Sequence, residues 1–225
     1  MHRYESDLTP KEKRKLEIEK IKGLSFTEKL EHMWAYHKLI LASPILLVLL
    51  IVFLHSFIQN SRMESVLNIA VTGGFETEVE AIVELTKEKL HIESRFSQVM
   101  IDTNYTTIDG EFERYSLQKF IVIVAAQGMD ILISNPGIYE IYKEQEFFMD
   151  LGHFFSEEEL LSMTLTDTYA INITSYSLVK ERFNLPYETV YFMVIANVDI
   201  DEANHEGMTK RELIRGFYRY VIAGR

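Results

Sequence analysis

The longest apolar run of the chain covers residues 39–58, LILASPILLVLLIVFLHSFI. It contains no Asp, Glu, Lys or Arg, and fifteen of its residues are Leu, Ile, Val or Phe. A helix rises about 1.5 Å per residue, so the run extends about 30 Å, the thickness of a bilayer's hydrocarbon core. The pattern predicts a transmembrane helix over residues 39–58. The alternative is a fully buried core helix, which the length and the lack of charge disfavour.

The basic residues around this run predict its orientation. Residues 20–38 contain four lysines, whereas residues 59–77 contain one arginine. An excess of Lys and Arg marks the cytoplasmic side of a membrane helix. We therefore expect a single-pass protein of the cell membrane, with a cytoplasmic N-terminus and an extracytoplasmic C-terminal domain. Because no cleavage-site pattern follows the run, we expect it to remain as an anchor.

Residues 1–38 are predicted to form a cytoplasmic tail that contains helices. Thr9 and Ser25 each precede a glutamate by three residues, the pattern of a helix-capping box, and Pro10 suits the first helical position. Trp34 and Tyr36 stand just before the apolar run, which is typical of an amphipathic helix at a membrane interface. The alternative is that the transmembrane helix simply extends inward.

Residues 28–38, EKLEHMWAYHK, followed by an apolar run, carry a family resemblance. The segment resembles an uncharacterised group of bacterial single-pass membrane proteins with a KLEY-x-W-x-YYKW-like sequence before the membrane. His37 stands where that group usually has Tyr, and Leu39 replaces its Trp. The resemblance covers residues 25–60 well and the rest by pattern only. It implies a small outer domain similar to part of a periplasmic solute-binding protein, and no catalytic residues.

Beyond a polar linker at residues 59–65, short β-branched runs alternate with amphipathic stretches. Strands are predicted at residues 66–71, 94–103, 129–134, 169–174 and 190–196. Helices are predicted at residues 76–90, 111–127, 136–148, 156–163 and 209–221. The segment 111–127 contains FIVIV, so a strand is the alternative there. Strands separated by helices predict one α/β domain over residues 66–225, with a mostly parallel sheet and helices on both faces.

Composition narrows the possible functions. The chain has no cysteine, which excludes disulfides, thiolate catalysis and cysteine-ligated zinc, and favours a bacterial envelope over a eukaryotic cell surface. Residues 59–225 contain 14 Lys and Arg against 27 Asp and Glu. An acidic domain lacks the basic surface that nucleic acids require, so we expect no nucleic-acid partner.

The carboxyl ends of the predicted strands are the candidate binding site, because ligands of open parallel sheets bind outside those ends. The residues there are small or uncharged and polar: Thr72, Gly73, Gly74, Asn104, Ser134, Asn135, Thr174 and Ser175. Gly73 and Gly74 precede a predicted helix and could present N–H groups to an anion. Turns between strands and helices favour the same residue types for conformational reasons alone, so both interpretations stay open.

Catalytic motifs of the HExxH, GxSxG and kinase types do not occur, and we expect no catalytic residues, metal ligands or cofactor. The sequence favours a membrane-anchored, non-enzymatic accessory or interaction subunit of a membrane complex, such as a transporter. The alternatives are a solute- or peptide-binding sensor lobe and an enzyme. A complete solute-binding protein needs two lobes, which favours the accessory role. Expected partners are the lipid bilayer and another membrane protein, with a small molecule or peptide as the alternative ligand.

Overall fold

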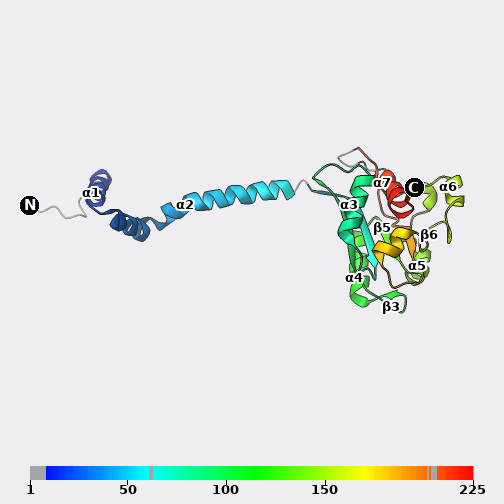
Figure 1. Ribbon diagram of the computed structural model, residues 1–225. Helices are drawn as coiled ribbons and strands as arrows, with labels where there is room; N and C mark the ends of the chain where they lie inside the picture. The colour runs from blue at the N-terminus through cyan, green and yellow to red at the C-terminus, as the bar shows by residue number, and fades with distance from the viewer. Residues whose placement is uncertain (1–8, 61–62, 202, 204–206, 225) are drawn as a thin grey trace, which may run out of the picture. The chain divides into compact units, whose positions relative to one another are not determined.

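The structure is a computed structural model that describes residues 9–60, 63–201, 203 and 207–224 (Figure 1). The chain divides into two compact units, Met1–Arg62 and Met63–Arg225. The first unit is helical and the second is a mixed α/β domain.

Two capped helices form the first unit, α1 (Pro10–Lys22) and α2 (Phe26–Asn60). The backbone N–H and the hydroxyl of Thr9 donate to Glu12 Oε2 at 2.9 and 2.7 Å, and Ser25 donates to Glu28 in the same way. These hydrogen bonds hold the pKa of both glutamates below the ordinary value. The predicted capping boxes are thus confirmed. α2 is one continuous helix over the predicted interfacial segment and the apolar run.

The predicted membrane span is contradicted. Among the residues that the structure describes, none of the helices has both the length and the hydropathy needed to cross a membrane. The side chains described in the apolar part of α2 are those of residues 42–58, and those of residues 39–41 lie outside the described set. The predicted transmembrane helix over residues 39–58, and the single-pass localisation that rests on it, are therefore corrected.

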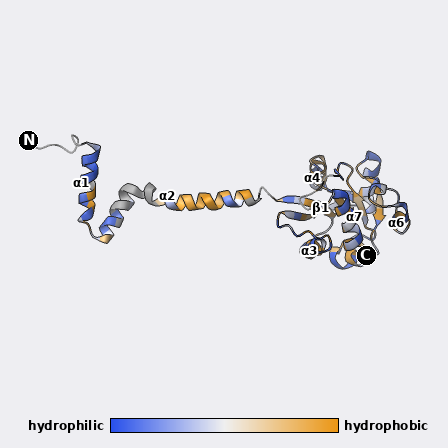
Figure 2. Ribbon diagram, turned by 90° about the horizontal axis from the view of Figure 1, so that it is seen from above, coloured by the Kyte–Doolittle hydropathy of each residue, from blue (hydrophilic) through white to orange (hydrophobic). Residues whose placement is uncertain are grey.

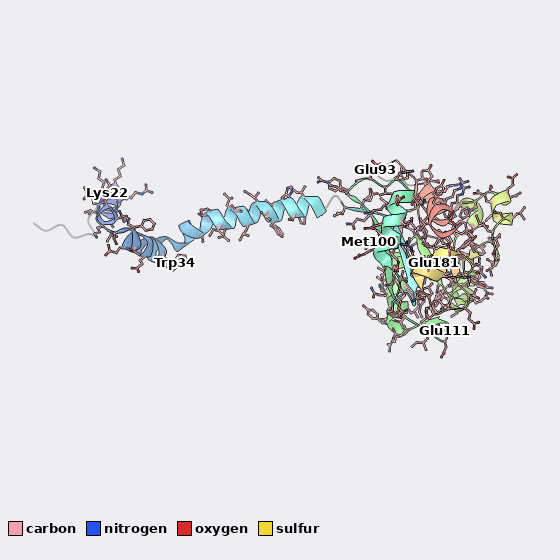
Figure 3. All side chains as sticks on the ribbon, viewed as in Figure 1. Lys22, Trp34, Glu93, Met100, Glu111 and Glu181 are labelled. Carbon is pink, nitrogen blue, oxygen red and sulfur yellow. The ribbon has the colours of Figure 1, made fainter. Side chains whose placement is uncertain are left out.

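The two helices of the first unit differ in character. Figure 2 shows α1 as mostly hydrophilic and the second half of α2 as strongly hydrophobic. Pro44 lies inside α2, where its ring removes one backbone donor from the helix. The Trp34 side chain projects from the first half of α2 and is 69 % exposed (Figure 3).

A five-stranded sheet with the order β2-β1-β5-β7-β6 forms the centre of the second unit. Its strands are β1 (Glu64–Thr72), β2 (Ser97–Tyr105), β5 (Ile131–Ser134), β6 (Ala170–Asn172) and β7 (Tyr191–Val194). A separate antiparallel hairpin joins β3 (Thr107–Ile108) to β4 (Glu111–Phe112). Each of the five predicted strands is confirmed, with small shifts at the ends.

The sheet is mixed, so the prediction of a mostly parallel sheet is wrong. β1 pairs in parallel with β2 and β5, whereas β7 pairs antiparallel with both β5 and β6. Neighbouring parallel strands need a crossover connection, which is usually a helix. The connection from β6 to β7 holds only the short π-helix η4 (Val179–Phe183). β7 therefore starts beside the end of β6 and runs in the opposite direction.

The regular helices of this unit are α3 (Val79–Lys89), α4 (Arg114–Ala125), α5 (Pro136–Tyr142), α6 (Glu157–Leu161) and α7 (Lys210–Gly216). Shorter turns are η2 (Lys143–Gln145) and η3 (Leu151–His153), and the π-helix η5 (Phe217–Ile222) continues α7.

The chain moves one way along the sheet from β1 to β2, and the other way from β2 to β5. Right-handed crossovers then place α3 and α4 on opposite faces, as Figure 2 shows. α4 also confirms the helix predicted over residues 111–127.

The three central strands supply the middle of the core. Every residue of β5 is buried, and Phe192, Met193 and Val194 of β7 are fully buried. Continuous apolar runs of this kind are expected where a strand is covered on both faces. The sheet is therefore held mainly by apolar burial at its centre.

A buried ion pair fastens the last helix to this sheet. Asp130 directly precedes β5, and its side chain is 3 % exposed. Its Oδ2 accepts hydrogen bonds from the backbone N–H of Asn68 at 2.7 Å and from Lys210 Nζ at 3.0 Å. Lys210 Nζ also donates to the carbonyl of Val66 at 2.8 Å. A cation in the first turn of a helix interacts unfavourably with the helix dipole. The position of Lys210 is therefore explained by its ion pair with Asp130, and not by the helix that it begins.

Breaking this ion pair should destabilise the domain. Asp130→Asn or Lys210→Met removes this ion pair at a buried position, and we expect the free energy of unfolding to fall by about 3 kcal/mol. The double variant should lose less than the sum of the two single losses, because each removes the same interaction. Urea denaturation of the full chain measures these values. Lys180→Met, at an exposed position, is the control and should change stability by less than about 0.5 kcal/mol.

Tyr139 is a second buried polar group. Its ring is fully buried, lies 5.7 Å from the ring of Phe148 and meets Tyr191 edge-on at 5.6 Å. Its hydroxyl donates to Asp167. Burial, followed by the hydrogen bond to Asp167, raises the pKa of Tyr139 well above its ordinary value.

This shift predicts a loss of stability at alkaline pH. The native state favours the neutral phenol, so the stabilisation is complete below pH ~10, where the unfolded tyrosine is also neutral, and declines as the pH rises toward the native pKa. The contribution to the slope is at most about 1.4 kcal/mol per pH unit. Tyr139→Phe should flatten the fall of stability above pH ~10 in urea denaturation, whereas Tyr115→Phe, with a ring 71 % exposed, should leave the slope unchanged. An equal slope in all three proteins would contradict this assignment.

Candidate functional site

The reversal of strand order places a switch point between the carboxyl ends of β1 and β5, where α/β sheets usually bind ligands. Thr72 ends β1 and Ser134 ends β5, and both side chains are fully buried. Their hydroxyl oxygens lie 2.8 Å apart and form a hydrogen bond. The two hydroxyls thus satisfy each other inside the protein.

A tyrosine from a distant loop covers the turn after β1. Gly73 has a φ of +64°, and its N–H donates to the carbonyl of Tyr105 at 2.9 Å. A Cβ at Gly73 would lie 2.6 Å from Tyr187 Oη, which is hydrogen-bonded to Thr107 Oγ1 at 2.7 Å. Gly74 is buried, and a Cβ there would lie 2.8 Å from Thr77 Oγ1. Both glycines are therefore required by close packing of the protein's own side chains.

Gly73 and Gly74 do not directly precede a helix, and the anion site predicted there stays a prediction. α3 begins at Val79, and the intervening turn is tied to the segment around η4. Thr77 Oγ1 donates to the carbonyl of Phe183 at 2.8 Å, and the N–H of Glu78 donates to the carbonyl of Arg182 at 2.9 Å. The N–H groups of Gly73, Thr77 and Glu78 are thus already used within the protein.

Asn135 acts as the cap of α5, as its sequence pattern predicts. Its Oδ1 accepts from the N–H of Ile138 at 3.1 Å, and the residue is 4 % exposed. Its Nδ2 is buried without a hydrogen-bond partner among the described residues. A Cβ at Gly137 would lie 2.5 Å from the carbonyl oxygen of Gly110, so the β3–β4 hairpin packs directly onto this helix start.

The other candidate residues lie at the same edge but apart from this centre. Asn104 is exposed near the end of β2, and its carbonyl accepts from Lys119 Nζ at 3.4 Å. Thr174 follows β6. In the sheet, β7 lies between β6 and β5. Its hydroxyl donates to Asn172 Oδ1 at 2.7 Å and accepts from the N–H of Val190 at 2.8 Å. Ser175 is exposed beside it. The structure thus brings Thr72 and Ser134 into contact, and leaves Asn104, Thr174 and Ser175 outside that contact.

The close fit at Gly73 gives a test of this packing. Gly73→Ala should lower the free energy of unfolding by about 1–2 kcal/mol for the left-handed backbone alone, and by more because Tyr187 must move. Gly207→Ala is the matched control: its φ is +78°, but no atom of the described residues lies within 4 Å of an added Cβ. Urea denaturation should show the larger loss at Gly73. Equal losses would mean that Tyr187 does not fill the space above the turn.

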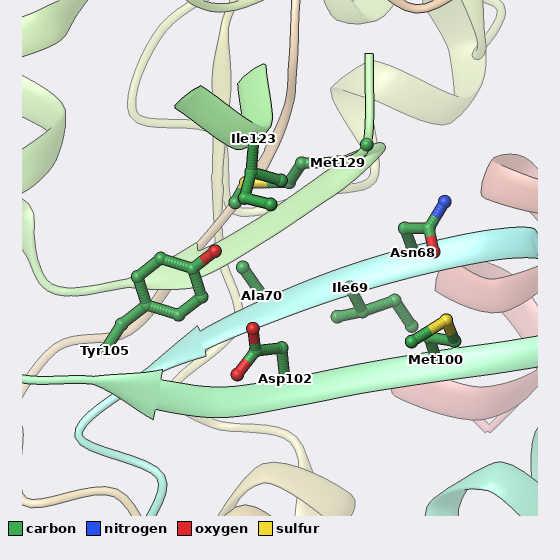
Figure 4. Close-up of a pocket in the computed structure, with 9 residues that line it drawn as sticks. Asn68, Ile69, Ala70, Met100, Asp102, Tyr105, Ile123 and Met129 are labelled. Atoms are coloured by element: carbon green, nitrogen blue, oxygen red, sulfur yellow. The ribbon is translucent and has the colours of Figure 1, made fainter. Parts of the chain in front are cut away.

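A small cavity lies on the sheet face beneath α4 (Figure 4). Its volume is about 120 Å³, which is room for about four water molecules. The lining residues are Asn68, Ile69, Ala70, Met100, Asp102, Tyr105, Ile123, Gly128 and Met129. Most of this lining is apolar, and the cavity is small for an organic ligand.

The charged group of this cavity is already paired. Asp102 Oδ2 lies 2.5 Å from Lys119 Nζ, and that ammonium sits 4.2 Å from the centre of the Tyr105 ring. Burial, followed by the nearby charge of Asp102, raises the pKa of Tyr105. A neutral phenol and a carboxylate held by a lysine provide neither a nucleophile nor a free base. The arrangement suits structural support better than acid–base chemistry.

Sequence reasoning missed Asp130, which pairs with Lys210 of α7, and Tyr187, which packs against Gly73. A lone acid before an apolar strand is a signal for Asp130, because a charge there must be paired when the strand is buried. Tyr187 carries no local signal, since its contact with Gly73 depends on the fold. Among the described residues, no group of three or more His, Asp and Glu side chains could hold a metal ion.

Comparisons with known proteins add no relative. No known family matches the chain, and neither a curated protein nor a solved structure matches it.

Proposed function

We propose that the chain is a non-enzymatic interaction subunit, in which helices of a partner protein cover the apolar part of α2. The large apolar side chains between Ile45 and Ile58 carry this proposal, because they are 47–65 % exposed. Residues 45–54 are apolar without interruption, so the apolar surface runs all round the helix. A helix of this kind is normally buried on every side, and large exposed apolar surfaces mark interaction sites.

The free energy of apolar burial favours a helical partner. Covering the exposed part of each Leu, Ile, Val or Phe contributes about 1 kcal/mol. Twelve such side chains are exposed between Ile45 and Ile58, and together they contribute about 12 kcal/mol, which is comparable with the cost of association of about 4–15 kcal/mol. A partner that offered only a flat polar surface would leave this contribution unused. We therefore expect the partner to supply apolar helices.

The alternative of solute binding at the carboxyl edge has less support. Tyr187 packs against Gly73, and the hydroxyls of Thr72 and Ser134 bond to each other. A solute at this edge would have to displace both arrangements. This packing favours the interaction role over a sensor that uses the same edge.

Site-specific cross-linking tests the proposal. A photo-reactive amino acid in place of Leu50, which is 51 % exposed, should join the full chain to one defined protein in its native cells. The same group in place of Lys15 on the polar helix α1 is the control and should not. Leu46→Lys, one turn away, should abolish the adduct because it buries a charge in the contact. A cross-linker placed on the identified partner should recover this chain in return.

Two results would overturn the proposed role. Adducts that form only between copies of this chain would assign α2 to self-assembly. Adducts with many unrelated proteins, unchanged by Leu46→Lys, would show that the exposed surface has no specific partner.

A further inference from the structure

A second cavity, of about 310 Å³, lies between the end of α3 and the helix formed by α7 and η5. Lys89, Leu90 and His91 line it from the end of α3. Arg215, Arg219 and Tyr220 line it from the last helix. Figure 1 shows α3 and α7 in the same part of the domain, and a Cβ at Gly216 would lie 2.4 Å from Leu90 Cδ2. The two helices therefore meet at Gly216.

The charge of this cavity opposes that of the domain. Residues 59–225 contain 14 Lys and Arg against 27 Asp and Glu, yet three of those cations line this one cavity. The acid among its lining residues is Glu212. Glu212 Oε2 accepts from the N–H of Thr209 at 2.8 Å and from its hydroxyl at 3.1 Å. Its negative charge is thus engaged at the start of α7.

A single carboxylate holds both arginines. Arg215 Nη2 lies 3.1 Å from Glu159 Oε2, and Arg219 pairs with the other oxygen of Glu159. Glu159 is 22 % exposed and is not among the lining residues. Two guanidinium groups share one negative charge, so one positive charge is left in excess. Arg215 Nε is also buried without a hydrogen-bond partner among the described residues. Each guanidinium carries five N–H groups, so donors remain for a further acceptor.

We propose that this cavity binds a small organic oxyanion, a carboxylate or a phosphate ester with an apolar body. Arg215, Arg219 and Lys89 provide the charge that an oxyanion requires, and arginine matches the geometry of both groups. Leu90, Met208 and Tyr220 provide apolar and aromatic walls. The volume is at the lower end of the range for small-molecule sites.

Calorimetric titration of the full chain with phenyl phosphate and with benzoate tests this assignment. At least one of the two anions should bind, and the uncharged benzyl alcohol should not. Lys89→Gln should weaken binding about tenfold, because it removes a charged contact from an exposed residue that the fold does not need. Lys87→Gln is the matched control, since it makes the same charge change in the same turn of α3 and is not a lining residue. Higher ionic strength should weaken the binding that remains.

Three outcomes would overturn the proposal. The first is that neither anion binds at millimolar concentration. The second is that Lys87→Gln and Lys89→Gln weaken binding equally, which would indicate a general effect of net charge. The third is that benzyl alcohol binds as tightly as the anions, which would indicate an apolar cavity without a role for the cations.

Discussion

The pairing of Asp130 with Lys210 fixes where the last helix packs on the sheet. It connects three elements distant in sequence: the backbone of β1, the residue before β5 and the first turn of α7. The backbone of Asp130 also takes part, because its carbonyl accepts from the N–H of Ile195 next to β7 at 3.0 Å. Apolar burial supplies most of the stability, but because it is non-directional it stabilises similar packings to a similar degree. A buried ion pair is more selective, because another position for α7 would separate Asp130 from Lys210.

The carboxyl edge of the sheet illustrates why topology alone does not assign a function. The order β2-β1-β5 creates the switch point at which many α/β proteins bind ligands. In this chain the space is taken by Tyr187, by the β3–β4 hairpin and by the pair of hydroxyls from Thr72 and Ser134. The charged groups that could recognise a ligand gather instead at the opposite end of α3, beside α7 and η5. Function in such a fold depends on the side chains and not on the arrangement of the strands.

Local patterns in the sequence predicted local structure well. Thr9, Ser25, Asn135 and Thr209 were recognised as helix starts because a cap depends on residues within one turn. The direction of β7 could not be predicted in this way, since its apolar residues fit either a parallel or an antiparallel neighbour. The candidate site shows the same division. The candidate residues do lie at or near strand ends, but the tyrosine that covers Gly73 comes from more than a hundred residues away. The predicted membrane span depended on the apolar run alone, and among the described residues no helix meets the requirements for crossing a membrane.

The position of β7 also determines the order in which the sheet can be completed. β7 lies between β5 and β6, yet the ribosome makes it after both. Until Tyr191 has been synthesised, the fully buried strand β5 has a free edge on the side that β7 will occupy. At 5–20 residues per second, this interval after Ser134 lasts about 3–11 s. An apolar strand with a free edge is a template for pairing with another chain. During this period the nascent domain is open to incorrect pairing. Chaperone binding or a low local concentration of like chains would keep the free edge of β5 available for β7.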